Sequence, residues 1–260
     1  MHPSENEPEP RRAAGPIVGA IPARYGSTRL PGKVLMPIAG KPMIEHVWRR
    51  ASQAAGLERV VVLTDDRRIA EAATKFGADC EMTPDDCVSG TDRVAWAARS
   101  WQAAAEINIQ GDEPLIEPAA ITALAKHLRD HPRDPVATLA APAAEGDLGN
   151  PDVVKVVTDS RGYALYFSRA PIPYPRSEGG AAARRHVGIY GYQHEALLRL
   201  AALPPTPLER SESLEQLRAL ENDIPIRVLP VDRAWWGVDT IEDLQTVDRF
   251  LLEQLQAGSG

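Results

Sequence analysis

Short apolar segments alternate with helix-like segments through the first half of the chain, and this alternation limits the possible folds more than any other feature. The predicted strands are residues 17–21, 60–63, 79–82 and 107–109, and the predicted helices are residues 43–55, 67–76, 91–100 and 118–129. Such alternation is typical of an α/β fold, with a mostly parallel central sheet and helices on both faces. Ligands bind such sheets at the carboxyl ends of the strands, so we expect the functional site there.

The second half of the chain has a different pattern. The predicted strands are residues 153–157, 164–167, 187–192 and 226–229, and the predicted helices are residues 194–202, 213–220 and 241–255. The first two strands are expected to pair around a turn at 159–162. We therefore expect a smaller α+β lobe that covers the first half, with the last strand and helix returning to it.

Composition excludes several classes of protein. The formal net charge of −7 argues against a general nucleic-acid binder, and no apolar run approaches the roughly 18 residues of a membrane helix. Residues 1–15 are polar and lack the apolar core of a signal peptide, so we expect a disordered tail on a cytoplasmic protein. Cys80 and Cys87 match no common zinc spacing and are expected to be free thiols.

The loop that follows the first strand, residues 22–33, is suited to binding phosphate. It carries three cations, Arg24, Arg29 and Lys33, to oppose the roughly four negative charges of a triphosphate. The loop matches neither the P-loop pattern nor the dinucleotide-binding glycine pattern. A solvated basic loop is the alternative interpretation.

Two aspartates are candidate ligands for Mg²⁺. Asp112 lies in the sequence Gln-Gly-Asp-Glu-Pro at the end of a predicted strand, and Asp239 lies in Gly-Val-Asp-Thr before the last helix. Mg²⁺ usually takes only one or two protein carboxylates, and water and phosphate complete its coordination. A simple turn at Asp112 and a capping pair at Asp239 and Thr240 remain alternatives.

A further candidate is the segment 89–93, Ser-Gly-Thr-Asp-Arg, at the start of a predicted helix. Its hydroxyl and backbone groups are suited to hydrogen bonding with the polar edge of a nucleotide base. A plain helix N-cap is the alternative.

These segments together resemble the 3-deoxy-manno-octulosonate (Kdo) cytidylyltransferases. The motifs that carry the resemblance occur in the family's order over residues 17–252: IPAR at 21–24 with STRLPGK at 27–33, SGT at 89–91, QGDEP at 110–114, FSRAPIP at 167–173, HVGIY at 186–190, LEQLR at 214–218 and GVDT at 237–240. The resemblance implies a Rossmann-like nucleotidyltransferase that transfers CMP from CTP to Kdo for lipopolysaccharide biosynthesis. It also implies a Mg²⁺ cofactor and a homodimer.

The resemblance assigns roles to individual residues. The nucleotide-binding residues would be Arg24, Ser27, Arg29, Lys33, Ser89, Gly90, Thr91 and Arg93, and Lys33, Asp112 and Asp239 would be catalytic, the two aspartates as metal ligands. The sugar-acid ligands would be Gln110, Arg169, His186, Tyr190, Glu215 and Gln216. The chain would divide into the tail (1–15), a CTP-binding part (16–142), a sugar-acid and dimerisation lobe (143–225) and a returning strand and helix (226–260).

The chemistry of the acceptor supports these types of side chain. A keto sugar acid has a carboxylate, which calls for Arg or a charged His, and hydroxyls, which call for Gln, Glu and Tyr. Cys87, the Trp235-Trp236 pair and the small-residue loop 177–183 depart from the family's pattern. A related acceptor, such as an amino-substituted Kdo or a sialic-acid-like sugar, therefore remains an alternative. A non-catalytic nucleotide-binding protein is a separate alternative, against which the presence of both Asp112 and Asp239 argues.

Overall fold

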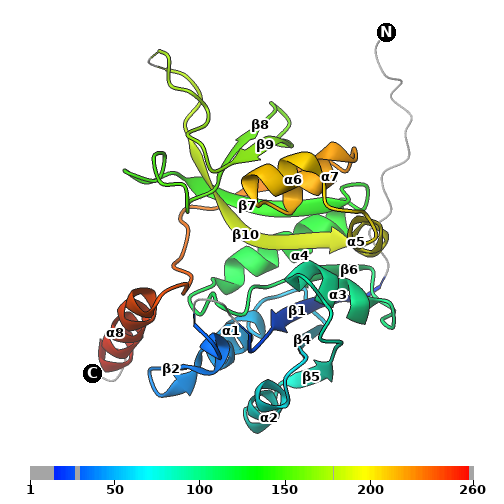
Figure 1. Cartoon of the computed structure of the whole chain (residues 1–260), viewed down its shortest axis with the longest axis vertical. Coiled ribbons are helices and arrows are strands. Elements are labelled where there is room, and N and C mark those ends of the chain that lie inside the picture. The colour runs from blue at the N-terminus through cyan, green and yellow to red at the C-terminus, as the bar shows by residue number, and fades with distance from the viewer. Residues whose placement is uncertain (1–14, 27–29, 178, 258–260) are drawn as a thin grey trace.

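One mixed sheet organises the chain in the computed structural model, which describes residues 15–26, 30–177 and 179–257 (Figure 1). Its main path has the order β11-β7-β10-β6-β1-β4-β5. These strands are β1 (Ile17–Ala23), β4 (Arg59–Thr64), β5 (Asp79–Met82), β6 (Ala105–Asn108), β7 (Val136–Pro142), β10 (Arg184–Gln193) and β11 (Ile226–Pro230). Neighbouring pairs are parallel except where β10 is involved, because β10 runs antiparallel to both β6 and β7. The predicted α/β sheet is confirmed.

Helices cover both faces of this sheet, as predicted. The helices of the first half are α1 (Met43–Ala51), α2 (Arg67–Lys75), α3 (Gly90–Ala98) and α4 (Pro118–Asp130), and α5 (His194–Ala201) and α7 (Gln216–Glu221) follow in the second half. Apolar side chains of α1, α2 and α4 join one buried cluster, and those of α3, α5 and α7 join another.

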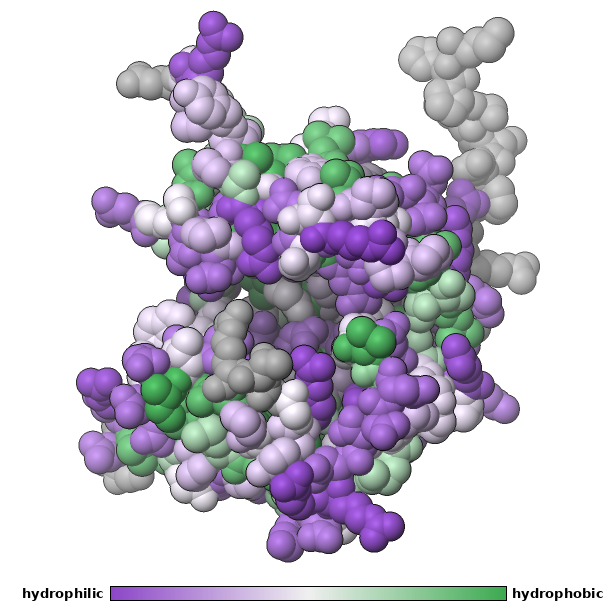
Figure 2. Space-filling model, in the orientation of Figure 1, coloured by the Kyte–Doolittle hydropathy of each residue, from purple (hydrophilic) through white to green (hydrophobic). Residues whose placement is uncertain are grey.

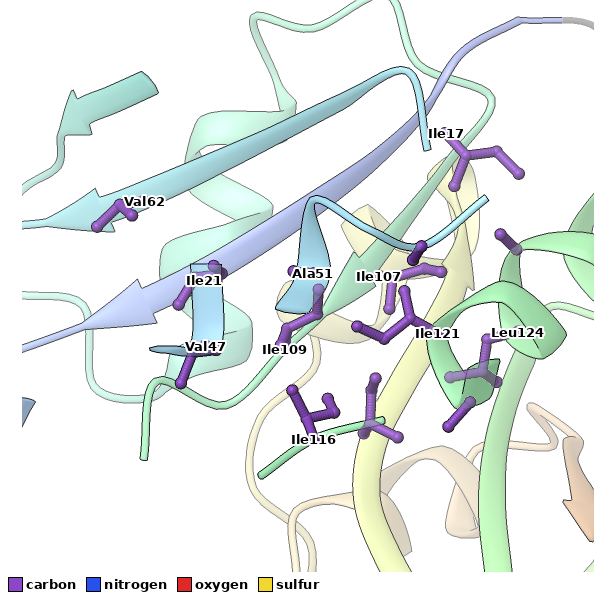
Figure 3. Close-up of a cluster of buried hydrophobic side chains, with 14 of the residues drawn as sticks. Ile17, Ile21, Val47, Ala51, Val62, Ile107, Ile109, Ile116, Ile121 and Leu124 are labelled. Carbon is purple, nitrogen blue, oxygen red and sulfur yellow. The ribbon is translucent and has the colours of Figure 1, made fainter. Parts of the chain in front are cut away.

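The central strands are apolar on both sides because each faces a layer of helices. Side chains alternate along β1, so that Ile17 and Ile21 enter the cluster under α1 and α4, whereas Val18 and Ala20 enter the cluster under α3. Figure 3 shows Ile17 and Ile21 in the first cluster, together with Ile107, Ile109, Ile121 and Leu124. An uninterrupted apolar run in the sequence is therefore required at these strands.

The structure has several elements that sequence analysis missed. Strand β7, helix α6 (Pro207–Glu212), the 3-10 turn η1 (Lys33–Leu35) and a two-stranded ribbon of β2 (Pro37–Ile38) and β3 (Lys41–Pro42) were not predicted. The sequence of β7 is rich in alanine, which has low strand propensity, and its pairing with β10 and β11 stabilises it. The helix predicted from Ser213 begins only at Gln216, because Ser213 has a left-handed φ of 52° and ends α6.

The second half contributes both to the central sheet and to a projecting hairpin. Strands β8 (Lys155–Thr158) and β9 (Ala164–Ser168) pair antiparallel, as predicted, and β8 also pairs with the start of β10. Because β10 lies between β6 and β7, the sheet is continuous across the two halves of the chain. The last helix, α8 (Ile241–Ala257), packs against the ribbon near Ile38 and Met43. No helix in the described part of the chain combines the length and apolarity needed to cross a membrane.

Candidate active site

A cavity of about 450 Å³ lies at the carboxyl ends of β1 and β6, where the sequence predicted the site. This volume is within the usual range for small-molecule sites. Its lining residues are Pro22, Ala23, Arg24, Lys33, Val34, Cys87, Val88, Ser89, Gly90, Arg93, Gln110, Gly111, Asp112 and Asp239. Figure 2 shows a hollow on this face, between the part of the molecule that contains α6 and α7 and the part that contains β1. Four of the motif segments therefore meet at one cavity.

Lys33 lies at the centre of the polar contacts. Its Nζ donates to Asp112 Oδ2 at 2.7 Å and to the carbonyl oxygen of Val238 at 2.7 Å, and lies 3.3 Å from Asp239 Oδ1. Lys33 is only 8% exposed, so its charge needs these partners. The turn η1 holds Lys33 in place, because Leu35 and Met36 donate backbone hydrogen bonds to Gly32 and Lys33.

Glycine lets the segments of the site approach one another closely. A Cβ atom on Gly111 would lie 3.0 Å from the carbonyl oxygen of Pro22, and a Cβ atom on Gly90 would lie 3.1 Å from the ring of the same proline. Both contacts would be tighter than normal packing permits. Asp112 therefore follows β6 directly beside the end of β1 because residue 111 has no side chain.

The start of α8 positions Asp239. Thr240 Oγ1 accepts a hydrogen bond from the Asp243 amide, and Asp243 Oδ2 accepts from the amides of Asp239 and Thr240. The capping role considered for Thr240 is therefore present. Val238 also donates its amide to the carbonyl oxygen of Asp112 at 2.9 Å, which joins the two aspartate segments.

The two aspartates form a donor set that fits Mg²⁺. Both carboxylates approach the same Lys33 ammonium, both line the cavity, and their side chains are 34% and 66% exposed. Carboxylate oxygens from one or two residues are the usual protein ligands of Mg²⁺, so the arrangement suits an ion shared with a bound phosphate.

The segment 89–93 forms the opposite wall of this cavity. Ser89 caps α3, because its Oγ accepts from the Asp92 amide while Asp92 Oδ2 accepts from the Ser89 amide. The cap considered for this segment is therefore present, and Ser89 lines the cavity as well, so its role at the nucleotide stays a prediction. Arg93 is 3% exposed and donates to Asp65 Oδ2 at 2.7 Å and to Thr83, so that it ties α3 to the ends of β4 and β5.

The phosphate-binding loop is described in part. Arg24 is exposed and lines the cavity beside Lys33. Ser27 and Arg29 lie outside the described residues. Cys80 and Cys87 are free thiols, as predicted; Cys87 lines the cavity, and burial raises the pKa of its thiol.

A second, smaller cavity of about 130 Å³ adjoins the first. It is lined by four of the six residues predicted to bind the sugar acid, Gln110, Tyr190, Glu215 and Gln216, and by Thr91. Gln110 lines both cavities, and Ser89 Oγ lies 3.4 Å from Glu215 Oε1 across the boundary between them. Burial raises the pKa of the Glu215 carboxyl. The predicted nucleotide and sugar groups are thus adjacent.

Sequence analysis missed Asn108 and Thr138. Asn108 lines the second cavity, and its buried Oδ1 makes no hydrogen bond with the described part of the chain. Such an atom calls for a ligand or water as its partner. Thr138 Oγ1 donates to the Ile189 carbonyl oxygen at 2.7 Å in the bulge of β10. An amide between two isoleucines in a buried strand was the available signal for Asn108.

Arg169 does not line either cavity. Its Nε and Nη1 donate to the carbonyl oxygens of Glu212 and Pro151 at 2.8 and 2.9 Å, and its amide donates to Glu212 Oε2. The fully buried Lys155 donates to the Arg169 carbonyl oxygen at 2.6 Å. Backbone acceptors therefore hold the Arg169 side chain, and its contact with a sugar acid stays a prediction.

His186 is next to the second cavity, and its ring is neutral near pH 7 in the protein without a ligand. Its ring lies edge-on to Phe167 at 5.0 Å and 5.4 Å from the ring of Tyr190, and Nε2 is 3.1 Å from Thr138 Oγ1. Burial lowers the pKa of His186 to about 3. The charged histidine expected as one possible partner of the acceptor's carboxylate is thus disfavoured in the unliganded protein, whereas a neutral ring is able to bind a hydroxyl. The contact of His186 with a sugar acid stays a prediction.

The lowered pKa of His186 predicts acid sensitivity. The unfolded chain binds a proton near pH 6.5 and the folded chain does not until about pH 3, so stability falls as the pH drops through this window. We expect this group to cost about 2 kcal/mol of unfolding free energy between pH 7 and pH 5. Urea denaturation at both pH values should show a smaller loss in His186→Gln than in the parent; equal losses would contradict the assignment.

Comparison with known proteins agrees with this site. A family model described as cytidylyltransferase matches residues 18–226. The 3-deoxy-manno-octulosonate cytidylyltransferases of Syntrophotalea carbinolica and Escherichia coli are 49% and 46% identical, each over 90% of this chain and over 98% and 96% of their own lengths. A solved structure of CMP:2-keto-3-deoxy-manno-octonic acid synthetase complexed with CTP has a TM-score of 0.89 and 46% identity, and covers 92% of this chain and 99% of that chain. The chain therefore belongs to the cytidylyltransferase family, among the 3-deoxy-manno-octulosonate cytidylyltransferases.

Proposed function

We propose that this protein transfers CMP from CTP to Kdo and releases pyrophosphate. The observation that carries the proposal is the convergence of Asp112 and Asp239 on Lys33 at the larger cavity, directly beside the smaller cavity lined by Gln110 and Glu215. Two adjoining cavities of different chemistry suit two substrates that must react with each other. The names of the relatives and of the CTP-bound structure supply the identities of those substrates.

The reaction we propose is direct, in-line transfer. The anomeric hydroxyl oxygen at C2 of the sugar acid forms a bond to the α-phosphorus of CTP, the bond from that phosphorus to the bridging oxygen breaks, and pyrophosphate leaves while the hydroxyl proton passes to water. Positioning and neutralisation of charge supply most of the catalysis in such transfers. Lys33 and Arg24 would hold the triphosphate, and the N-terminus of α3 would face the cytosine through Ser89 and Gly90, with Thr91 on the side of the smaller cavity.

Asp112 and Asp239 would hold Mg²⁺ in this scheme. The ion, when bound, neutralises phosphate oxygens and polarises the attacking hydroxyl. Lys33 would keep the two carboxylates together before substrate arrives, because it already contacts both.

The sugar acid would occupy the smaller cavity. Gln110, Tyr190, Glu215 and Gln216 offer amide, hydroxyl and carboxylate groups to its hydroxyls, and Asn108 Oδ1 adds an acceptor. His186 lies beside Tyr190, and we propose Arg169 as a further ligand. An amino-substituted or sialic-acid-like acceptor remains an alternative. Of the two features that raised it, the Trp235-Trp236 pair lines neither cavity, and the other is the loop 177–183.

We also propose a cytoplasmic homodimer, with the lobe at 143–225 providing the sugar site and the contact between subunits. The support for the contact is that this lobe exposes Leu165 (63%) and Tyr174 (81%), apolar side chains of the kind a partner chain covers.

Pyrophosphate release with a panel of substrates tests the proposal. We expect turnover with CTP and Kdo, and a clear preference for CTP over UTP, because a site that pairs with the 4-amino group of cytosine leaves polar groups unpaired with uracil. Turnover only with a different sugar acid would change the acceptor. Binding of CTP without turnover on any acid would favour the non-catalytic alternative.

Removing either carboxylate should abolish most of the activity. We expect Asp112→Asn and Asp239→Asn to lower kcat by at least about 100-fold, because metal stabilisation of the transition state is worth several kcal/mol. Asp79→Asn is the matched control, since Asp79 is exposed at the start of β5, at the opposite edge of the sheet. Steady-state kinetics with and without a chelator measure the effect; near-normal turnover of either variant in Mg²⁺ would exclude that residue as a principal ligand.

Substitutions in the two cavities should change the KM values of different substrates. We expect Glu215→Ala to raise the KM for Kdo about 10- to 150-fold, because it removes a contact between a carboxylate and a hydroxyl worth roughly 1.5–3 kcal/mol, and to change the KM for CTP far less. Lys33→Ala should impair the use of CTP first, and Glu71→Ala, an exposed change on α2, should alter neither constant. A larger effect of Glu215→Ala on CTP than on Kdo would reject the division into a nucleotide cavity and a sugar cavity.

A further inference from the structure

Residues 231–240 form an extended connection between β11 and α8, here called the connecting segment, and it carries Asp239 to the site. Figure 1 shows it as a long orange stretch without helix or strand. Backbone hydrogen bonds hold the segment near its two ends, where the Val231 amide donates to the Ala140 carbonyl oxygen and the Val238 amide donates to that of Asp112. Side-chain contacts between these ends add to the cap of α8 in determining where Asp239 lies.

Three hydrogen bonds join the connecting segment to the loop 112–117, and the two segments run in opposite directions along these contacts. Near its start, Arg233 Nε donates to Glu117 Oε1 at 2.9 Å, although this arginine side chain is 80% exposed. Near its end, the Val238 amide donates to the Asp112 carbonyl oxygen. Between them, Trp235 Nε1 donates to Glu113 Oε2 at 2.8 Å.

Of these two side-chain hydrogen bonds, the one from Trp235 is better shielded from water than the one from Arg233. The indole ring packs against two buried clusters at once, the one under α1 and α4 and the one under α8. Trp236, by contrast, is 55% exposed and meets Phe250 edge-on at 5.9 Å. Adjacent tryptophans therefore have different surroundings, and only Trp235 is joined to the loop that carries Asp112.

Glu113 is a fixed acceptor for this indole. Its Oε2 accepts from Trp235, while a Cβ atom placed on Gly188 would lie 3.9 Å from its Oε1, so the carboxyl lies between the connecting segment and the bulge of β10. Asp112 is its neighbour in the chain. A single hydrogen bond thus couples the connecting segment to the aspartate loop.

We propose that Trp235 is a positioning residue for Asp239: its indole N–H, held by Glu113, fixes the register of the connecting segment so that the Val238 carbonyl oxygen and the Asp239 carboxylate reach Lys33. If the connecting segment shifted by one residue along the loop 112–117, the amide of a neighbouring residue would take the place of Val238 at the Asp112 carbonyl oxygen. Asp239 would then lie farther from Asp112. The effect on activity rests on the proposed role of Asp239 in the transfer reaction. The register of the connecting segment does not, because it can be measured in the protein without substrate.

The test compares two identical changes at adjacent positions. Trp235→Phe removes the N–H donor and retains an aromatic ring, and Trp236→Phe is the control. We expect Trp235→Phe to raise the Mg²⁺ concentration for half-maximal activity by about 10-fold or more and to lower kcat, with little change in the KM for Kdo, as for loss of a partner that orients a metal ligand. Hydrogen–deuterium exchange of the protein without metal or substrate should be faster over residues 236–240 in this variant and unchanged in Trp236→Phe.

A double-mutant cycle of Trp235→Phe and Glu113→Ala tests the hydrogen bond itself. If Trp235→Phe folds poorly, Glu113→Ala alone still removes the acceptor and leaves the sequence of the connecting segment unaltered. We expect Glu113→Ala to speed exchange over the same residues, and Trp235→Phe to add little in that background. Exchange in Trp235→Phe equal to that in Trp236→Phe, or full additivity with Glu113→Ala, would overturn the proposal. An inactive parent enzyme with the expected exchange pattern would instead reject the proposed function and leave the register argument standing.

Discussion

The buried ammonium of Lys33 is the interaction on which the rest of the site depends. A charge that is removed from water requires partners, and Lys33 finds them in Asp112, Asp239 and the Val238 carbonyl oxygen. These groups come from three parts of the chain: Lys33 follows β1, Asp112 follows β6, and Val238 and Asp239 precede α8. One side chain therefore links the phosphate-binding loop, the central sheet and the last helix.

The sheet topology explains why these segments meet. Strands β1 and β6 are parallel neighbours, so the loops that follow them leave the same edge of the sheet. Strand β10 enters this edge from the opposite direction, beside β6, and Tyr190 is paired with Asn108 in the ladder. The antiparallel strand thus brings the smaller cavity against the larger one. A purely parallel sheet would have placed a strand end there instead of the middle of β10.

Much of the first half was predictable because its signals are local. A strand buried on both faces needs an apolar run, and the segments at 17–21 and 107–109 have one. The cap of α3 at Ser89 and the cap of α8 at Thr240 also depend on residues within one turn, so their patterns are visible in the sequence. Strand β7 was missed because its alanines have little local preference and its pairing with β10 and β11 decides its structure.

The sequence by itself determined the α/β class, the position of the site at strand ends and the types of charge gathered there, because these depend on periodicity and on neighbours in the chain. The tertiary structure decided which of the candidates share a cavity. Lys33 and its aspartate partners are 79 and 206 positions apart, and no local pattern encodes their contact. The neutral state of His186 and the backbone contacts of Arg169 were likewise decided by the fold, because burial and distant carbonyl groups set them, and neither is a property of the residues nearby in the chain.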